Sequence, residues 1–361
     1  MNKKKEDDPH SFKTRLLRSI FLGFIMILKI LRLPSSWFSP KTRKIKDNWT
    51  LSMLWAFVSS LGKKAFMDQP CTYKVATDES KALVEPQYQL SPEQIMEFHE
   101  KGFLGPLDAI PESEMAIFRQ QIEKELELES KAFGIKSVRD RHIDAPFIQD
   151  LFSHKNITEV LAQLLGPDIL LWRSQVFNQM PGAPPIVWHQ SSTYMHEDYK
   201  QPILKPQNIN ELFQLTVWVA VDNATEENGC LQFIPGSHDK IRKVKMNGKN
   251  SFYKARFDMD MDVQPSDIVS MPLRPGQFVV FSERCVHGSP GNRSKNSRRM
   301  GINFRAITPS TAVYTDQKKH YAAHLDTTWD LKNWGVIKLR GEDKYKLNKY
   351  IEVEQNELVE N

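Results

Sequence analysis

Two histidines in this sequence stand where a chain could grip a metal ion. His189 closes the apolar run PIVWH, and His287 lies in FVVFSERCVHG (278–288), 98 residues further on. Fe(II) enzymes commonly use two histidines and one carboxylate and keep other coordination positions open. An Asp two residues after the first histidine would complete such a set, but the sequence has Ser191 there. The segment therefore indicates an iron site without its usual carboxylate, a site whose third position is left open, or no metal site at all.

Several interpretations of Ser191 remain open. An external anion such as a halide can fill the coordination position and balance the charge that a missing carboxylate leaves. Glu197 or Asp198 can supply a carboxylate from residues 196–210, which we expect to form a lid over the site. Ser191 and a water molecule can instead complete an oxygenase site, or the site can be retired and kept for binding alone.

Two arginines downstream of His287 favour an anionic cosubstrate. Arg299 and Arg305 lie in the run RMGINFRAI (299–307), an even number of residues apart, so they share one face of a strand, and Arg298 takes the other. A guanidinium pairs with a carboxylate through two parallel hydrogen bonds, and a buried one needs an anion. We therefore expect a dicarboxylate beside the metal.

The elements that position these residues change type along the chain. Ser91 and Gln94 predict the start of a helix that Gly102 ends, and helices are also expected over 112–131 and 157–165. β-branched and aromatic runs then predict strands over 169–177, 212–222, 230–235, 276–282 and 299–307. Helices followed by many short strands favour an α+β chain with a double-stranded β-helix core, a jelly-roll or cupin-like arrangement with flanking helices.

The motifs and their order resemble the phytanoyl-CoA dioxygenase family over roughly residues 90–340. The similar segments are WHQSSTY (188–194), TVW (216–218), NGCLQFIPGSH (228–238), PGQF (275–278), His287 and RMGINFR (299–305). Members of that family use Fe(II), 2-oxoglutarate and O₂, and these segments are most similar to its chlorinating branch. Hydroxylating members carry Asp where this chain has Ser191, and chlorinating members carry a small residue, usually Ala or Gly.

The resemblance implies roles for the residues around the metal. His189 and His287 would hold Fe(II), and Arg299 would bind the distal carboxylate of 2-oxoglutarate. Arg305 would orient water or chloride. Ser191 would act in catalysis, because its hydroxyl can donate a hydrogen bond to a bound chloride, which alanine cannot do.

The remaining candidates line the cofactor pocket. Thr216 and Trp218 would face the site from the opposite strand with a hydroxyl and an indole N–H. Gln175 alternates inward with Arg173 and Phe177 on its own strand, so we expect it at the pocket as well.

These expectations describe a non-haem Fe(II)/2-oxoglutarate-dependent halogenase. It would use chloride on an unactivated aliphatic carbon of a small-molecule, carrier-protein-tethered, amino-acyl or lipid-like substrate. The alternative within the same chemistry is an Fe(II)/2-oxoglutarate-dependent hydroxylase. The alternative of another class is a non-catalytic, membrane-associated binding protein built on a retired jelly roll.

The charge of the chain is concentrated at its N-terminus. Residues 1–64 contain 14 Lys and Arg against 4 Asp and Glu, a net +10, whereas the remainder has 35 basic and 40 acidic residues. The main domain therefore gives no support to nucleic-acid binding. The three cysteines are far apart and lack metal-ligand spacing, which favours a reducing, cytoplasmic compartment.

The basic segment also contains two apolar runs, over residues 16–33 and 49–62. Each is interrupted by charge or shorter than the roughly 20 residues that span a bilayer. We expect residues 12–64 to contact a membrane surface, peripherally on the inner face. A helical extension docked on protein, a cleaved signal or a true span are the alternatives.

The chain is thus expected to divide into three parts. Residues 1–85 form a basic, apolar helical extension, residues 86–345 form the jelly-roll domain, and residues 346–361 form a polar tail.

Overall fold

A computed structural model of the protein describes residues 12–49, 51–63, 69–70, 80–191, 203–242, 244–246, 257–259, 261–315, 317–322 and 327–351. Its α-helices are α1 (Phe12–Ile30), α2 (Pro40–Asn48), α3 (Leu51–Ser59), α4 (Pro92–Lys101), α5 (Glu112–Glu125), α6 (Pro146–Ser153) and α7 (Lys155–Leu165).

Helix α4 begins and ends as its sequence predicts. The Ser91 hydroxyl accepts from the Gln94 amide N–H, the Gln94 side chain accepts from the Ser91 N–H, and Gly102 ends the helix in a left-handed conformation. Helix α5 stops at Glu125, so the prediction that it reaches residue 131 was wrong. Buried Arg141 donates to the carbonyls of Glu125 and Leu128 and terminates it, a long-range contact that local helix propensity does not contain.

The strands form two main antiparallel sheets. One has six strands in the order β18-β3-β14-β6-β12-β2, and the other has four in the order β11-β7-β13-β4. The first sheet comprises β2 (Phe103–Asp108), β3 (Ile169–Gln179), β6 (Gln214–Ala220), β12 (Gln277–Ser282), β14 (Arg299–Ile307) and β18 (Ile337–Arg340). The second comprises β4 (Ile186–His189), β7 (Leu231–Phe233), β11 (Val269–Met271) and β13 (His287–Ser289).

Shorter strands pair in twos around these sheets. They are β1 (Gln69–Pro70) with β8 (Lys240–Ile241), β5 (Leu204–Pro206) with β15 (Thr311–Val313), β9 (Val244–Met246) with β10 (Phe257–Met259), and β16 (Lys319–Ala322) with β17 (Thr327–Asp330).

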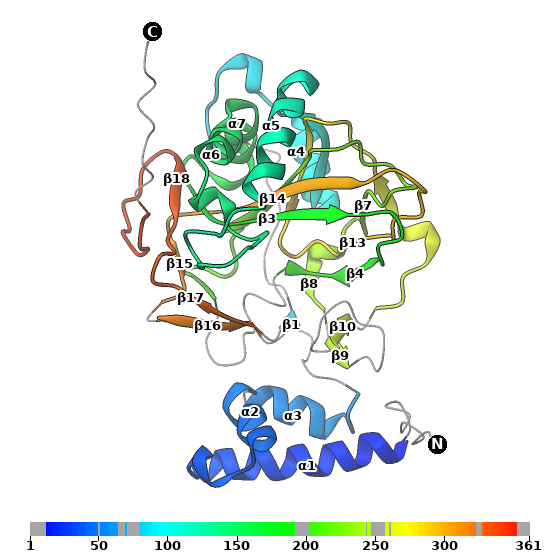
Figure 1. The fold of residues 1–361 in the computed structure, drawn as a ribbon, viewed down its shortest axis with the longest axis vertical. Coiled ribbons are helices and arrows are strands. Elements are labelled where there is room, and N and C mark those ends of the chain that lie inside the picture. Colours follow the sequence, from blue (N-terminus) through cyan, green and yellow to red (C-terminus); the bar gives the residue numbers. More distant parts are fainter. Residues whose placement is uncertain are drawn as a thin grey trace.

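The layers follow from the alternation of side chains along β14. Met300, Ile302 and Phe304 pack into a core shared with α4–α7. Figure 1 shows these helices gathered on one side of β3 and β14. The other face of that sheet packs against the four-stranded sheet through a second cluster, which includes Trp218, Phe233 and Phe281. Helices thus cover one face and a second sheet covers the other, an arrangement consistent with the expected jelly roll.

Helices α1 and α3 pack on each other through an apolar cluster of their own. Leu22 and Ile25 of α1 are buried against Leu54 and Phe57 of α3. Large apolar side chains stay exposed on α1, on α3 and in the segment between α1 and α2 (Leu17, Ile20, Phe24, Ile27, Leu31, Trp37 and Trp55). Among the described residues, no helix has the length and apolar character that crossing a membrane requires.

Candidate iron centre

The structure brings His189 and His287 together across two neighbouring strands. The two residues are direct partners of the antiparallel β4–β13 pair, and their ring centroids lie 4.2 Å apart. His189 Nδ1 lies 2.9 Å from the Val187 carbonyl and His287 Nδ1 lies 2.8 Å from the Cys285 carbonyl. A carbonyl oxygen only accepts, so both Nδ1 atoms carry the proton, and Nε2 of each ring is left as the metal-binding nitrogen.

The surroundings keep both imidazoles in the neutral form that binds metal. Burial lowers the pKa of His189 to about 4, opposed by the Val187 hydrogen bond and assisted by the positive charge of Arg305. Burial, then His189, then Arg305 lower the pKa of His287 well below its ordinary value. Neither ring needs to lose a proton before it binds a cation at neutral pH.

The side chain of Gln190 anchors the backbone at the end of β4 through hydrogen bonds. Its side chain is fully buried and donates to the carbonyls of Lys240 (2.7 Å) and Arg284 (2.5 Å), and it accepts from the Arg242 N–H (2.7 Å). This amide therefore ties the end of β4 to two other segments. It fixes the backbone on which His189 and Ser191 stand.

Ser191 is buried, and its hydroxyl has no hydrogen-bond partner among the described residues. Within the same part of the chain, no Asp, Glu or Cys joins the two histidines in a metal-binding group. Glu197 and Asp198, together with most of the expected lid, lie outside the described residues. Within the described residues the candidate metal site therefore consists of two imidazoles, with an unpartnered buried hydroxyl two residues beyond His189.

Arg299 forms a second polar feature on the inner face of β14. It is fully buried, and its guanidinium lies 5.4 Å from the centre of the Trp218 ring. One terminal nitrogen donates to Ser289 Oγ (2.8 Å) and to Gln179 Oε1, whereas Nε and Nη1 have no partner within the described structure. Burial lowers the pKa of Arg299 to about 10, which leaves it charged. A buried charge with two unused donors fits a carboxylate ligand.

Arg298 confirms the alternation predicted for this strand. It points to the other face, where it pairs with Asp222 (2.8 Å) and Glu123 (2.6 Å).

The other candidates stand in register on the inner face of three adjacent strands. Arg305 of β14 is opposite Thr216 of β6, and Asn303 is opposite Trp218. Asn303 is also opposite Gln175 of β3. Thr216 and Trp218 thus lie on the neighbouring strand of the arginines' own sheet, not on an opposite strand as expected.

Two parts of the Arg299 site were absent from the sequence prediction. Gln179 follows Gln175 and Phe177 at the same even spacing on β3, and Ser289 follows His287 by two residues on β13. Period-two alternation was the signal that could have found both.

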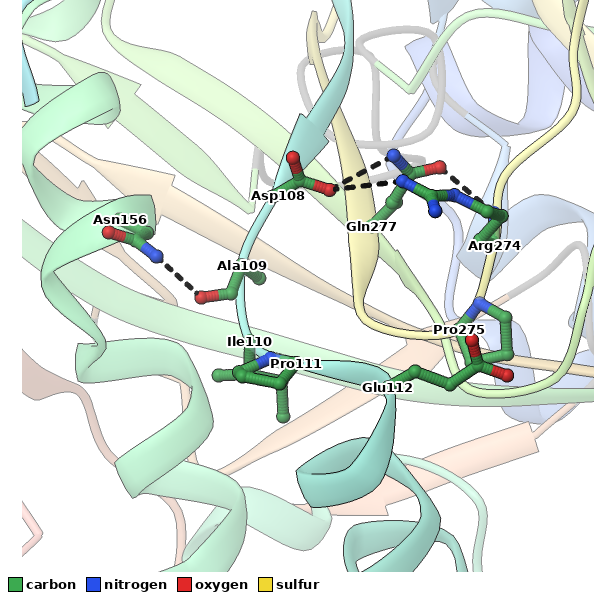
Figure 2. A pocket seen from close by; sticks show the side chains of 9 residues that line it. All are labelled: Asp108, Ala109, Ile110, Pro111, Glu112, Asn156, Arg274, Pro275 and Gln277. Atoms are coloured by element: carbon green, nitrogen blue, oxygen red, sulfur yellow. Dashed lines mark hydrogen bonds and ion pairs between the residues drawn. The ribbon is translucent and has the colours of Figure 1, made fainter.

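A surface pocket lies elsewhere (Figure 2). It has a volume of about 410 Å³ and lies between the end of β2, the start of α5 and the turn before β12. Asp108 accepts there from Gln277 (3.0 Å), and none of the candidate residues lines it. We assign it no part in the chemistry.

Together the fold and the candidate site fit one class of protein: a jelly-roll iron oxygenase in which two histidines would hold the metal and a buried arginine would bind an acidic cosubstrate. The family model described as phytanoyl-CoA dioxygenase (PhyH) matches residues 98–300, more than half of the chain, and the chain belongs to this family. This membership places it among the Fe(II)- and 2-oxoglutarate-dependent oxidoreductases.

Comparisons with individual proteins agree with membership of this family. The chain is 30% identical over 183 residues to phytanoyl-CoA dioxygenase domain-containing protein 1 of Danio rerio, covering 50% of this chain and 53% of that protein. It is 24% identical over 256 residues to methylphosphonate hydroxylase of Gimesia maris, covering 66% and 90%. The solved structure "CytC3 with Fe(II) and alpha-ketoglutarate" shares the fold, with a TM-score of 0.57 and 24% identity over 72% of this chain and 92% of that one. These names do not distinguish a chlorinating branch.

Proposed function

We propose that the protein is a non-haem Fe(II)/2-oxoglutarate-dependent halogenase that chlorinates an unactivated aliphatic carbon. The observation that carries the proposal is Ser191: a buried, unpartnered hydroxyl in the described structure, at the position where a carboxylate would otherwise complete the iron site. Two neutral imidazoles leave the charge of Fe(II) uncompensated, and chloride supplies both a ligand and a negative charge.

Each residue of the site has a defined task in this reaction. His189 and His287 hold Fe(II), and Arg299 receives the distal carboxylate of 2-oxoglutarate on its unused Nε and Nη1 donors. Ser191 leaves room for chloride and donates its O–H to it. Trp218 and Phe281 exclude water from the inner wall. Bound Fe(II), with 2-oxoglutarate and O₂, supplies the oxidant that removes hydrogen from the carbon.

The overall reaction balances with these components. A C–H bond, chloride, 2-oxoglutarate, O₂ and one proton give a C–Cl bond, succinate, CO₂ and water. The carbon of the substrate and C1–C2 of 2-oxoglutarate are oxidised, and O₂ is reduced.

The alternative is a hydroxylase, which the name of the Gimesia maris relative favours. In that case water or a carboxylate from Glu197 or Asp198 occupies the position assigned here to chloride. Succinate and CO₂ then form without any requirement for halide.

The test compares wild type, Ser191→Ala and Ser191→Asp, each loaded anaerobically with Fe(II) and 2-oxoglutarate. We expect chloride and bromide to shift the visible absorption of the wild-type complex and of Ser191→Ala, and to leave that of Ser191→Asp unchanged. A wild-type complex that binds 2-oxoglutarate but ignores halide would support the hydroxylase. Failure to take up iron at all would support the non-catalytic binding protein.

We also propose that residues 12–64 attach the enzyme to the inner, cytoplasmic face of a membrane. Leu17, Ile20, Phe24 and Ile27 follow one another at helical spacing on the exposed face of α1, and Trp37 and Trp55 are more than half exposed. The surrounding net charge of +10 suits an anionic surface. Such attachment favours a lipid-like substrate over a carrier-tethered one.

Sedimentation with vesicles tests this attachment. We expect full-length protein to bind phosphatidylglycerol-containing vesicles and Ile20→Ser/Phe24→Ser to lose most of that binding. Ile117→Ser is the matched control, because Ile117 is 60% exposed on α5 and Ile20 is 62% exposed on α1. Equal sedimentation of all three proteins would contradict the proposal.

A further inference from the structure

A second group of buried arginines lies beyond Arg305 on the inner face. Arg305 is the direct strand partner of Arg173 on β3, and Arg139 pairs through its backbone with Gln175 of the same strand. Arg139 and Arg173 are 5% and 7% exposed. Two guanidinium groups on adjacent segments, both removed from water, are costly unless an anion compensates them.

The same phenol oxygen joins these two arginines. Tyr314 Oη accepts from Arg139 Nη2 (3.1 Å) and from Arg173 Nη2. Tyr314 has a φ of 51°, a left-handed conformation that costs a non-glycine residue roughly 1 kcal/mol or more. A phenol hydroxyl is a donor as well as an acceptor, so Tyr314 can also offer an O–H to a ligand.

A β-bulge adds an aromatic wall. The register between β14 and β3 passes from Arg305–Arg173 to Ala306–Leu171, which leaves Trp172 unpaired and turned to the same side as Arg173. The Arg173 guanidinium lies 4.3 Å from the Trp172 ring centre, and the Arg139 guanidinium lies 4.8 Å from that of Trp329. These rings hold the guanidinium planes in place.

The buried arginines of this group are not fully compensated, either in charge or in hydrogen bonds, by the described residues. Asp140 pairs with Arg139 (3.4 Å) and its charge also acts on Arg173, but no carboxylate of the described residues forms an ion pair with Arg173. Arg173 Nε, Trp329 Nε1 and Gln317 Nε2 are buried donors without acceptors in the described part of the chain. A surplus of donors and positive charge calls for a ligand that is anionic and only accepts hydrogen bonds.

We infer that Arg139, Arg173 and Tyr314 bind a phosphate-class oxyanion, a phosphate ester or phosphonate, carried by the substrate. Donors approach from three separate elements, which suits a tetrahedral oxyanion, whereas the single guanidinium of Arg299 suits a planar carboxylate. Arg305 is the strand partner of Arg173 beside this site, and its positive charge also acts on both imidazoles of the iron centre. The inference rests on the proposed function in that the bound molecule is the substrate of the iron centre.

Binding to the full-length protein tests the inference without turnover. Titration calorimetry with octyl phosphate is expected to show binding, and Arg173→Gln is expected to weaken it by about 10- to 100-fold. Tyr314→Phe, which keeps the ring and removes the hydroxyl, is expected to weaken it by roughly 5-fold or more. Octanol and octanoate, which share the chain but lack a phosphate, are expected to bind at least 10-fold more weakly.

A reciprocal variant separates this site from the cofactor site. Arg299→Gln should lose 2-oxoglutarate binding and keep octyl phosphate, and Arg173→Gln should do the reverse. Absence of octyl phosphate binding to a wild type that binds 2-oxoglutarate, or octanoate binding as tight as octyl phosphate, would overturn the inference while the halogenase proposal stands. Halide insensitivity with normal octyl phosphate binding would overturn only the halogenase.

Competition identifies the source of the phosphate group. Displacement of octyl phosphate by phosphatidic acid vesicles, but not by phosphatidylcholine vesicles, identifies a lipid headgroup. Displacement by glycerol 3-phosphate identifies a soluble ester. Displacement by neither would count against a phosphate-class substrate.

Discussion

His189 and His287 are direct partners across two antiparallel strands, with ring centroids 4.2 Å apart, although 98 residues separate them in the chain. Each ring also donates through Nδ1 to the carbonyl two residues before it. The same local geometry is thus repeated on both strands, and it sets the tautomer of both rings before any metal binds.

Arg299→Gln should abolish productive 2-oxoglutarate binding. The variant loses the charge and the two donors that the described structure leaves unused, which we expect to raise the Kd by roughly 100-fold, or about 3 kcal/mol. Calorimetry with 2-oxoglutarate measures this. Arg298→Gln is the control, because Arg298 pairs with Asp222 and Glu123 on the opposite face. Comparable losses in both variants would exclude a specific role for Arg299.

Gly301→Ala should disturb the same site through Trp218. A Cβ at Gly301 would lie 2.0 Å from the Trp218 ring, so the ring must leave its position over Arg299. We expect about 1–3 kcal/mol of lost stability, measured by urea unfolding, and weaker 2-oxoglutarate binding. Gly23→Ala, whose Cβ meets its nearest described neighbour at 3.9 Å, should cost little. An unchanged affinity for 2-oxoglutarate in Gly301→Ala would refute the link to Trp218.

Gln190→Ala should loosen the end of β4. It leaves the carbonyls of Lys240 and Arg284 and the N–H of Arg242 without their buried partner, at a cost of about 2–4 kcal/mol in the free energy of unfolding. Iron affinity should fall as well, because His189 and Ser191 flank the lost anchor. Exposed Gln120 of α5 offers the comparison, and Gln120→Ala should behave as wild type. Iron binding that matches wild type would show that Gln190 supports the fold alone.

The stability of the metal-free protein should fall in mild acid. Burial lowers the pKa of His142 to about 4 and that of His320 to about 3, and both groups titrate near 6.5 when unfolded. Between these values the unfolded state binds more protons, so stability is complete above about pH 6.5 and declines as pH falls toward 4. At pH 5 His142 and His320 together contribute roughly 3 kcal/mol per pH unit, and His189 and His287 add to the slope because burial lowers their pKa values as well.

Urea unfolding of the chelator-treated protein at pH 7, 6 and 5 measures this slope. His142→Gln removes one of the two groups and should reduce their contribution by about half. A stability independent of pH between 7 and 5 would contradict the burial of these neutral imidazoles.

Much of the fold, and the strand face that carries each candidate site residue, was predictable from local pattern. The capping box at Ser91, the alternation of Arg298 and Arg299 and the extent of β14 all match the expectation, because each depends on neighbours a few residues away. The end of α5 was not predictable, since Arg141 reaches it from a separate segment. The short strand β2 was missed as well, because FLGPLD carries Gly and Pro and gains its pairing from β12.

The candidate site also has a part that the sequence predicted and a part that only the tertiary structure revealed. Residue types and even spacing, together with the resemblance to a known family, nominated His189, His287, Ser191 and Arg299. They did not reveal that Gln179 and Ser289 accept from Arg299, or that Arg139 and Tyr314 gather at Arg173.

The sequence by itself determined which side chains could bind iron and a carboxylate, and which face of each strand carries them, because alternation is a property of the extended chain. Only the tertiary structure decided which of those side chains meet, since strand register and a bulge at Trp172 depend on the packing of distant segments. It likewise decided which charges are buried without a partner in the described structure, because burial is a property of the whole fold. The buried arginines illustrate both contributions. The sequence specifies that these residues are arginines, and the packing around them removes them from water and so creates the need for an anion.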